Sequence, residues 1–190
     1  MTQPTGISAL QANPDPAEPA ARLARRWYAC YTRGHYEKRV AAHLQERQIE
    51  SFLPTHSEEH HWSDRTKRVA YPLFPSYVFA RFRAADLSCV LNIEGLVTIV
   101  RAGTTLLTIP DDEIANVRRF AETADRYGIA PVPEPFVDVG EHVRVTAGPL
   151  AGVEGIVLEW RRARTRVLIG LQAVGQGLSV NVDTSSLQRI

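Results

Sequence analysis

Hydrophobic and polar residues follow two different periods in the first two thirds of the chain. Residues 27–32 and 76–82 are rich in aromatic and β-branched types and alternate every second position, which is typical of strands. Residues 36–44 instead repeat their apolar positions with helical spacing. The other expected elements are strands at 50–59, 97–101 and 104–109 and helices at 86–92 and from Pro110 onwards. This order predicts an α+β fold in which helices pack on one mainly antiparallel sheet.

The strand at 76–82 carries large side chains on both of its faces. Alternation places Val78 and Phe82 on one face, where they form a credible core, and Tyr77 and Phe79 on the other. Two interpretations of the second face stay open. A helix covers it, or it is an exposed aromatic surface that docks a partner.

From residue 136 the pattern becomes all-β. Apolar segments of about five residues recur between glycine-containing turns, at 142–145, 155–160, 166–171 and 178–182, with a short strand at Leu187. This rhythm predicts a small barrel. The preceding segment, 124–135, contains a glycine and several prolines and is the best candidate linker. We therefore expect a flexible tail at 1–26, an N-terminal domain at 27–123, a linker at 124–135 and a barrel domain at 136–190.

Charge and composition narrow the possible functions. The 190 residues include 22 Lys and Arg against 21 Asp and Glu, a net charge of +1, so any nucleic-acid contact must come from local clusters of charge. Two scattered cysteines fit a reducing compartment. No apolar run is long enough for a membrane helix, and no secretory signal is evident. We expect a cytoplasmic protein with no membrane partner.

The sequence contains no recognisable catalytic motif. A phosphate-binding glycine loop, a nucleophile elbow and a pair of catalytic carboxylates are all missing from it. His56, His60 and His61 lie close together, but no cysteine accompanies them, and a solvated loop explains them better than a metal site. We expect no enzyme activity, no metal and no cofactor.

Two blocks of residues resemble a known family. The first contains Trp27-Tyr28, Glu37-Lys38-Arg39-Val40 and Pro72-Leu73-Phe74-Pro75-Ser76-Tyr77-Val78-Phe79; the second contains Gly140-Glu141-His142-Val143-Arg144-Val145 and Gly148-Pro149-Leu150-Ala151-Gly152-Val153. The first resembles the N-terminal (NGN) domain of NusG-type transcription elongation factors, and the second resembles the KOW motif of their C-terminal SH3-like barrel. The residues of the first block are most similar to those of the specialised RfaH-like paralogues.

The resemblance implies a partner and the residues that contact it. In the family, the aromatic patch docks on the clamp coiled coil of RNA polymerase and favours continuous elongation. Here that patch corresponds to Phe74 and Tyr77, with Tyr31 from the neighbouring strand. A transcription elongation and antitermination factor that acts as a monomer is therefore expected.

The resemblance also implies contact with the displaced non-template DNA strand. The matching positions are Arg33, Arg39 and His43, and the basic tip Arg65, Lys67 and Arg68 extends this surface. Arginines suit phosphate contacts, and a histidine suits an unpaired base. By spacing alone, a solvated helix face explains the same residues.

Some positions depart from the family pattern. The partner loop of the barrel, which in NusG offers Ile-Phe-Gly-Arg to termination factor Rho and to a ribosomal protein, reads Ala173-Val174-Gly175-Gln176 here. Loss of the phenylalanine and arginine removes the residue types that dominate such interfaces. The RfaH-like basic residue before Gly95 is Glu94, so DNA reading should also differ. Because glycines disfavour helix, we expect a barrel that does not switch to helices.

We therefore predict a specialised NusG paralogue that promotes processive elongation and antitermination. One alternative within the family is the housekeeping factor, which assists Rho and couples transcription to translation. An alternative of another class is a KOW-type RNA-binding or ribosome-associated protein, for which the arginines at 161–166 would provide contacts.

Overall fold

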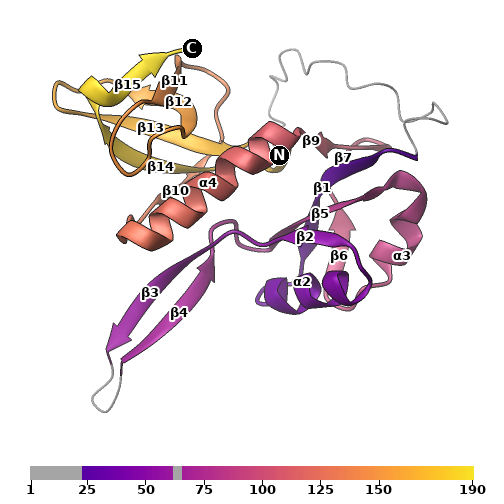
Figure 1. Ribbon diagram of the computed structural model, residues 1–190. Helices are drawn as coiled ribbons and strands as arrows, with labels where there is room; N and C mark the ends of the chain where they lie inside the picture. Colours follow the sequence, from indigo (N-terminus) through magenta and orange to yellow (C-terminus); the bar gives the residue numbers. More distant parts are fainter. Residues whose placement is uncertain (1–22, 62–65) are drawn as a thin grey trace, which may run out of the picture.

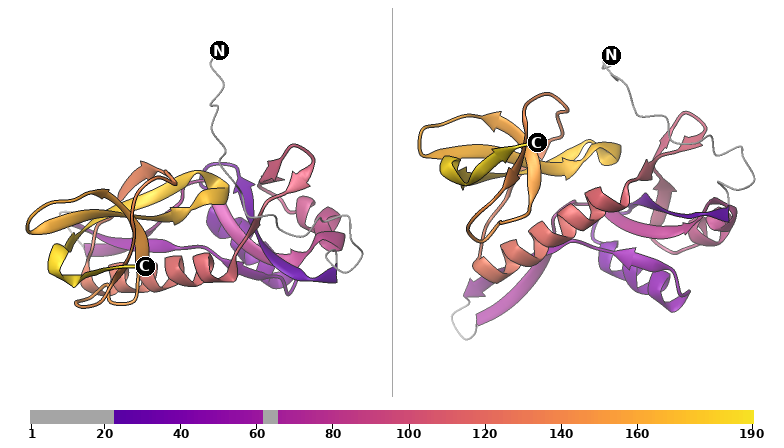
Figure 2. Two further views of the ribbon diagram at one scale, coloured as in Figure 1. Left: turned by 90° about the horizontal axis from the view of Figure 1, so that it is seen from above. Right: turned by 45° about the horizontal axis from the view of Figure 1, so that its top comes forward.

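The computed structural model describes the backbone of residues 23–61 and 66–190. It describes their side chains as well, except within 58–68. The two larger antiparallel sheets lie on opposite sides of one long helix, α4 (Asp111–Tyr127), in Figure 1 and in the right view of Figure 2. The predicted α+β architecture is confirmed. None of the described helices is long and apolar enough to cross a membrane. Of the predicted tail at 1–26, residues 1–22 lie outside the described residues.

The N-terminal sheet has the order β2-β5-β1-β6, and β9 also pairs with β1. Its members are β1 (Arg25–Thr32), β2 (Glu50–Phe52), β5 (Tyr77–Arg83), β6 (Leu96–Ile99) and β9 (Thr108–Ile109). The other elements of this half are α2 (Glu37–Glu46), the 3-10 turn η1 (Ala84–Asp86), α3 (Leu87–Leu91) and the hairpins β3 (Thr55–His61) with β4 (Thr66–Pro72) and β7 (Arg101–Ala102) with β8 (Thr105–Leu106). The hairpin β3–β4 projects from the body of the protein in Figure 1.

The C-terminal sheet, called the barrel below, has the order β10-β14-β13-β12-β11-β15. Its strands are β10 (Val132–Pro135), β11 (His142–Val145), β12 (Glu154–Glu159), β13 (Arg164–Leu171), β14 (Gln176–Asp183) and β15 (Leu187–Arg189), with 3-10 turns η2 (Gln172–Val174) and η3 (Thr184–Ser186). Close strand packing requires glycine at position 155, where a Cβ would lie 2.5 Å from the Leu168 carbonyl oxygen. Four of the predicted strands are found within two residues of their expected ends.

The predicted linker at 124–135 is wrong at both of its ends. Helix α4 continues to Tyr127 and ends at Gly128, whose φ of 63° is the left-handed geometry of a helix stop. Val132–Pro135 then pairs with β14 as an edge strand of the barrel. Prolines are tolerated there because an edge strand leaves some backbone N–H positions without a ladder partner. Only residues 128–131 connect the helix to the barrel.

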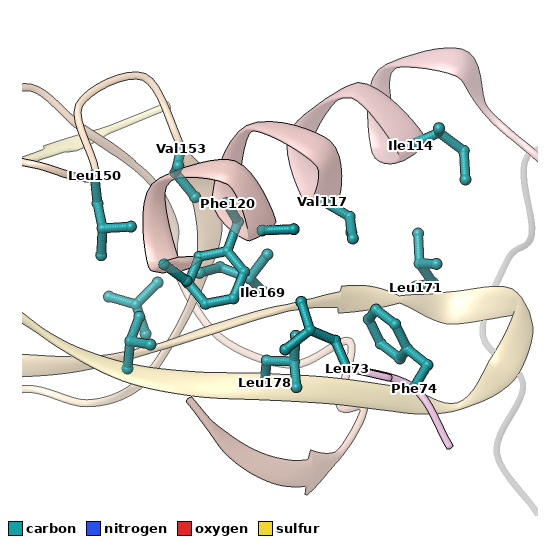
Figure 3. Close-up of a cluster of buried hydrophobic side chains, with 14 of the residues drawn as sticks. Leu73, Phe74, Ile114, Val117, Phe120, Leu150, Val153, Ile169, Leu171 and Leu178 are labelled. Carbon is teal, nitrogen blue, oxygen red and sulfur yellow. The ribbon is translucent and has the colours of Figure 1, made fainter. Parts of the chain in front are cut away.

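Two hydrophobic clusters cover the two faces of the N-terminal sheet. The helix-side cluster joins α2 and α3 to the sheet through Val40, Leu44, Val90, Val78 and Phe82. On the opposite face, a shared cluster contains side chains of the sheet, of α4 and of the barrel. Figure 3 shows the part of this cluster where Leu73 and Phe74 lie beside α4 and the barrel. The proposed division into domains at 27–123 and 136–190 stays a prediction, because the two sheets share this cluster.

Candidate functional site

The predicted docking residues lie in a tight turn that leads into β5. In this aromatic turn, Phe74-Pro75-Ser76-Tyr77, the Tyr77 N–H donates to the Phe74 carbonyl oxygen at 3.2 Å. Proline in second place and a φ of 65° at Ser76 in third place are the pattern of a type II turn. The turn therefore presents its first and last side chains from a fixed backbone.

A buried carboxylate holds the aromatic turn against α2. The Ser76 N–H donates to Oε1 of Glu37 at 2.8 Å, and Glu37 is only 6 % exposed. The Ser76 carbonyl oxygen accepts the N–H of Thr32 at 2.8 Å. These bonds tie the turn to the end of β1 and to the first residue of α2. Sequence reasoning did not assign Glu37 this contact.

Two of the three predicted polymerase-binding residues form an accessible pair. The rings of Tyr31 and Tyr77 are 5.4 Å apart, with an interplanar angle of 58°. Tyr31 is 39 % exposed, and Tyr77 is half-buried. Partial burial, followed by the neighbouring Tyr31, raises the pKa of Tyr77 above its ordinary value. The pair offers apolar ring surface with a polar edge, which suits a protein interface.

The third residue, Phe74, is covered. It is only 1 % exposed and packs edge-on against Phe79 at 5.7 Å. Figure 3 shows Phe74 and Leu73 in one group with Leu171 and Leu178 of the barrel. Of the two interpretations left open for this face, the covered one applies to Phe74 and Phe79 in this conformation, because α4 and the barrel lie on that side of the sheet.

Polar bonds fasten the barrel to α4 beside the shared cluster. The Asn116 side-chain amide donates to the Glu154 carbonyl oxygen at 2.7 Å and accepts the Glu154 N–H at 2.8 Å. One turn along the helix, Arg119 donates to the carbonyl oxygen of Gly152. Asn116 thus satisfies both backbone groups of one barrel residue. Its position on α4 gave no signal in the sequence, because only the tertiary structure brings Glu154 to it.

Glu113 is a second contact between α4 and the barrel. Its carboxylate accepts a hydrogen bond from the backbone of Gln172, and its Oε2 atom is buried without a partner among the described residues. Burial, helped by the negative charges of Asp112 and Asp138, raises the pKa of Glu113 to about 7. A carboxyl group with such a pKa changes between its neutral and its charged form within the physiological pH range.

The predicted partner loop at 173–176 packs partly against the shared cluster. It joins β13 to β14, and Ala173 and Val174 are half-buried against the shared cluster. Gly175 has a φ of 65°, and its carbonyl oxygen accepts the N–H of Phe136 at 3.0 Å. The loop and Phe74 therefore belong to one closed contact.

Acidic side chains lie beside two of the predicted DNA-binding residues. Arg39 lies 3.3 Å from a carboxylate oxygen of Glu94 and 5.1 Å from the centre of the Tyr36 ring. His43 Nδ1 lies 3.1 Å from Oε2 of Glu46. Arg33 is exposed just before the helix. The sequence singled out Glu94 as a departure, and the structure gives it a physical effect, because it offsets the charge of Arg39.

The basic tip of the hairpin β3–β4 lies mostly outside the described part of the chain. Arg65 lies outside the described residues. Lys67 and Arg68 belong to β4, where their backbones pair with His60 and Glu59, but their side chains are outside the described part. Their role in nucleic-acid binding therefore stays a prediction.

The family of the chain follows from comparison with known proteins. A family model for "Transcription termination factor nusG" matches residues 25–118, which span the N-terminal sheet and the start of α4. The chain belongs to the NusG family. Transcription termination/antitermination proteins NusG from Pseudomonas aeruginosa and Thermus thermophilus are 25 % and 27 % identical to it. The alignments cover 88 % and 87 % of this chain and 100 % and 98 % of those proteins.

A solved NusG structure has the same fold. The structure titled "Domain interaction in Thermotoga maritima NusG" covers 87 % of this chain and 97 % of its own, with a TM-score of 0.51 at 19 % identity. The predicted NusG resemblance is confirmed. The match runs through both sheets, so the shared fold includes the barrel as well as the N-terminal sheet.

Proposed function

We propose that this NusG-family protein is a transcription elongation factor that docks on the clamp coiled coil of RNA polymerase. The observation that carries the proposal is the aromatic turn, in which Tyr77 pairs with Tyr31 at an accessible edge of the sheet. Large aromatic side chains held on a rigid backbone are the residue types that dominate protein interfaces. The protein acts by binding in the cytoplasm, as a monomer, and not as an enzyme.

Docking through Phe74 requires a change of conformation. In the present structure the barrel covers this side chain, together with Leu73. The unit at 27–123 would carry the polymerase-binding surface, and the barrel at 136–190 would act as its cover. Polymerase binding therefore competes with the contact between the barrel and α4. The free energy needed to open that contact reduces the binding free energy, so the affinity is lower.

A specialised paralogue that promotes antitermination is the role within the family that we favour. The partner loop lacks the phenylalanine and arginine that its relatives would offer, and Ala173 and Val174 pack inwards. Rho and the ribosomal protein thus have few large side chains to bind. Stimulation of Rho-dependent termination by this protein in a purified system would instead support the housekeeping role.

Contact with the non-template DNA strand is a secondary part of the proposal. Arg33 lies just before α2, and Arg39 and His43 lie along one side of this helix, near the aromatic turn. Glu94 reduces the positive charge available there. We expect weak binding that depends strongly on salt, because it rests on few phosphate contacts.

Affinity for purified core RNA polymerase tests the proposal. Tyr31→Ala/Tyr77→Ala removes the accessible pair, whereas Tyr127→Ala removes an exposed aromatic ring at the far end of α4 and serves as the matched control. We expect the double variant to lose at least tenfold in affinity, about 1.4 kcal/mol, and the control to match wild type. Folding is checked by thermal unfolding of each variant.

Two results would contradict the proposal. A folded wild-type protein that does not bind polymerase would redirect attention to RNA and to the arginines at 161–166. Equal affinities of wild type and the double variant would mean that polymerase binds another surface.

A further inference from the structure

One carboxyl group lies inside the contact between α4 and the barrel. Glu113 occupies the first turn of α4 and accepts a hydrogen bond from the backbone of Gln172 in η2. The Gln172 side chain in turn donates to Oδ2 of Asp138 at 3.2 Å. Glu113 is therefore enclosed from the barrel side by residues that move with the barrel.

The surroundings of Glu113 disfavour its negative charge. The charges that act on it in the described part of the chain are those of Asp112 on its own helix and Asp138 of the barrel, and both are negative. Its Oε2 atom is buried and accepts no hydrogen bond from a described residue. A buried carboxylate oxygen without a donor is costly, whereas a neutral carboxyl group avoids most of that cost.

We propose that Glu113 is a proton-sensitive latch: the barrel rests on α4 while this carboxyl group is neutral, and its ionisation favours release of the barrel. Release would uncover Phe74 and the partner loop together, because both pack in the contact that opens. The latch itself needs no partner. Only its consequence for polymerase binding rests on the function proposed above.

The sign of the effect follows from proton linkage. Closure raises the pKa of Glu113 from its ordinary 4.5 to about 7, so the closed state binds a proton more tightly than the open state. Raising the pH through this range therefore favours opening, and lowering it favours closure. Between pH 6 and pH 8 the opening constant should rise about tenfold. Below the ordinary value both states are protonated and the dependence disappears.

Hydrogen exchange at one backbone amide measures the opening directly. The Glu154 N–H is bonded to the side chain of Asn116 across the contact, so opening of the contact exposes it. Exchange is followed by NMR in the full-length protein, for wild type and for Glu113→Gln. The ratio of the two rates cancels the intrinsic dependence of exchange on pH. Glu122→Gln, at an exposed position of the same helix, is the matched control.

The expected result is a ratio of wild-type to Glu113→Gln rates that rises about tenfold from pH 6 to pH 8. The Glu122→Gln variant should follow wild type, and the Val40 amide, which lies within α2, should show no such change. A ratio that stays constant with pH would overturn the latch.

A second measurement guards against a variant that does not fold. The carboxyl ¹³C shift of Glu113 in the wild-type chain should titrate near pH 7, and a midpoint at or below pH 5 would overturn the latch. If the latch holds but Glu113→Gln binds polymerase as wild type does at pH 8, the proposed competition between the barrel and polymerase fails and the latch stands.

Discussion

The two faces of the N-terminal sheet are closed in different ways. On the face of α2 and α3, every buried residue of the helix-side cluster lies between Tyr28 and Ile99. On the opposite face, the shared cluster extends from Trp27 to Val182 and draws on both sheets and α4. The first face is completed by its own segment of chain, and the second depends on the barrel.

This difference separates stability from regulation. Loss of the barrel contact leaves the helix-side cluster intact, so the N-terminal sheet keeps one complete core. The same loss uncovers Leu73 and Phe74, which are 3 % and 1 % exposed in the closed structure. A face that is completed by a distant segment can be uncovered without unfolding the sheet, and such a face is suited to a binding surface that opens.

The largest expected effect comes from replacing one buried phenylalanine in each cluster and comparing stability and amide exchange. Phe120→Ala and Phe82→Ala each empty a buried site, and each should lower the free energy of unfolding by about 3–5 kcal/mol. Only Phe120 lies in the shared cluster, so only its loss should also accelerate exchange of the Glu154 amide. Denaturant unfolding and amide exchange check the two parts.

Equal acceleration of that amide by both variants would contradict the comparison. It would mean that the barrel is released whenever either core is weakened, and that the two faces are not independent.

A smaller effect is expected from the polar bonds across the contact. Asn116→Ala leaves the N–H and carbonyl groups of Glu154 without their partner and should weaken closure by about 1–3 kcal/mol. Glu122→Ala, on the same helix and exposed, should leave closure unchanged. Exchange at the Gly152 amide, which bonds within the barrel to Val145, reports whether the barrel itself stays folded.

The smallest effect concerns the two thiols. Burial raises the pKa of Cys30 to about 12, whereas Cys89 is exposed. At pH 8 the Cys30 thiol is neutral as well as covered, so a thiol reagent should label only Cys89 in the native protein. The same selectivity in Asn116→Ala would show that the helix-side cluster stays sealed when the barrel is released. Rapid labelling of Cys30 in that variant would show the opposite.

The sequence predicted local structure better than contacts between distant segments. Strand β11 was expected at 142–145 and is found at His142–Val145, because apolar alternation and flanking turns define it locally. The start of α4 at Pro110 was equally clear from its proline and acidic first turn. Strand β10 was taken for a linker, because its prolines suggest irregular structure unless the neighbouring β14 is known.

The candidate site shows the same limit. The aromatic turn was recognised from its residues, but the burial of Phe74 depends on Leu171 and Leu178, about a hundred positions away. Asn116 and Glu113 could not be singled out, because their partners lie in the barrel. Residue type thus indicated which side chains suit a partner interface, and tertiary packing determined which of them are covered.

The most direct test of this account is the affinity of core RNA polymerase for Asn116→Ala compared with wild type, each with and without Tyr31→Ala/Tyr77→Ala. If the barrel covers the docking surface, Asn116→Ala should bind more tightly than wild type, and the tyrosine substitutions should weaken binding in both backgrounds. An unchanged affinity in Asn116→Ala, when exchange at Glu154 shows that the contact has opened, would contradict the claim that the barrel controls polymerase docking.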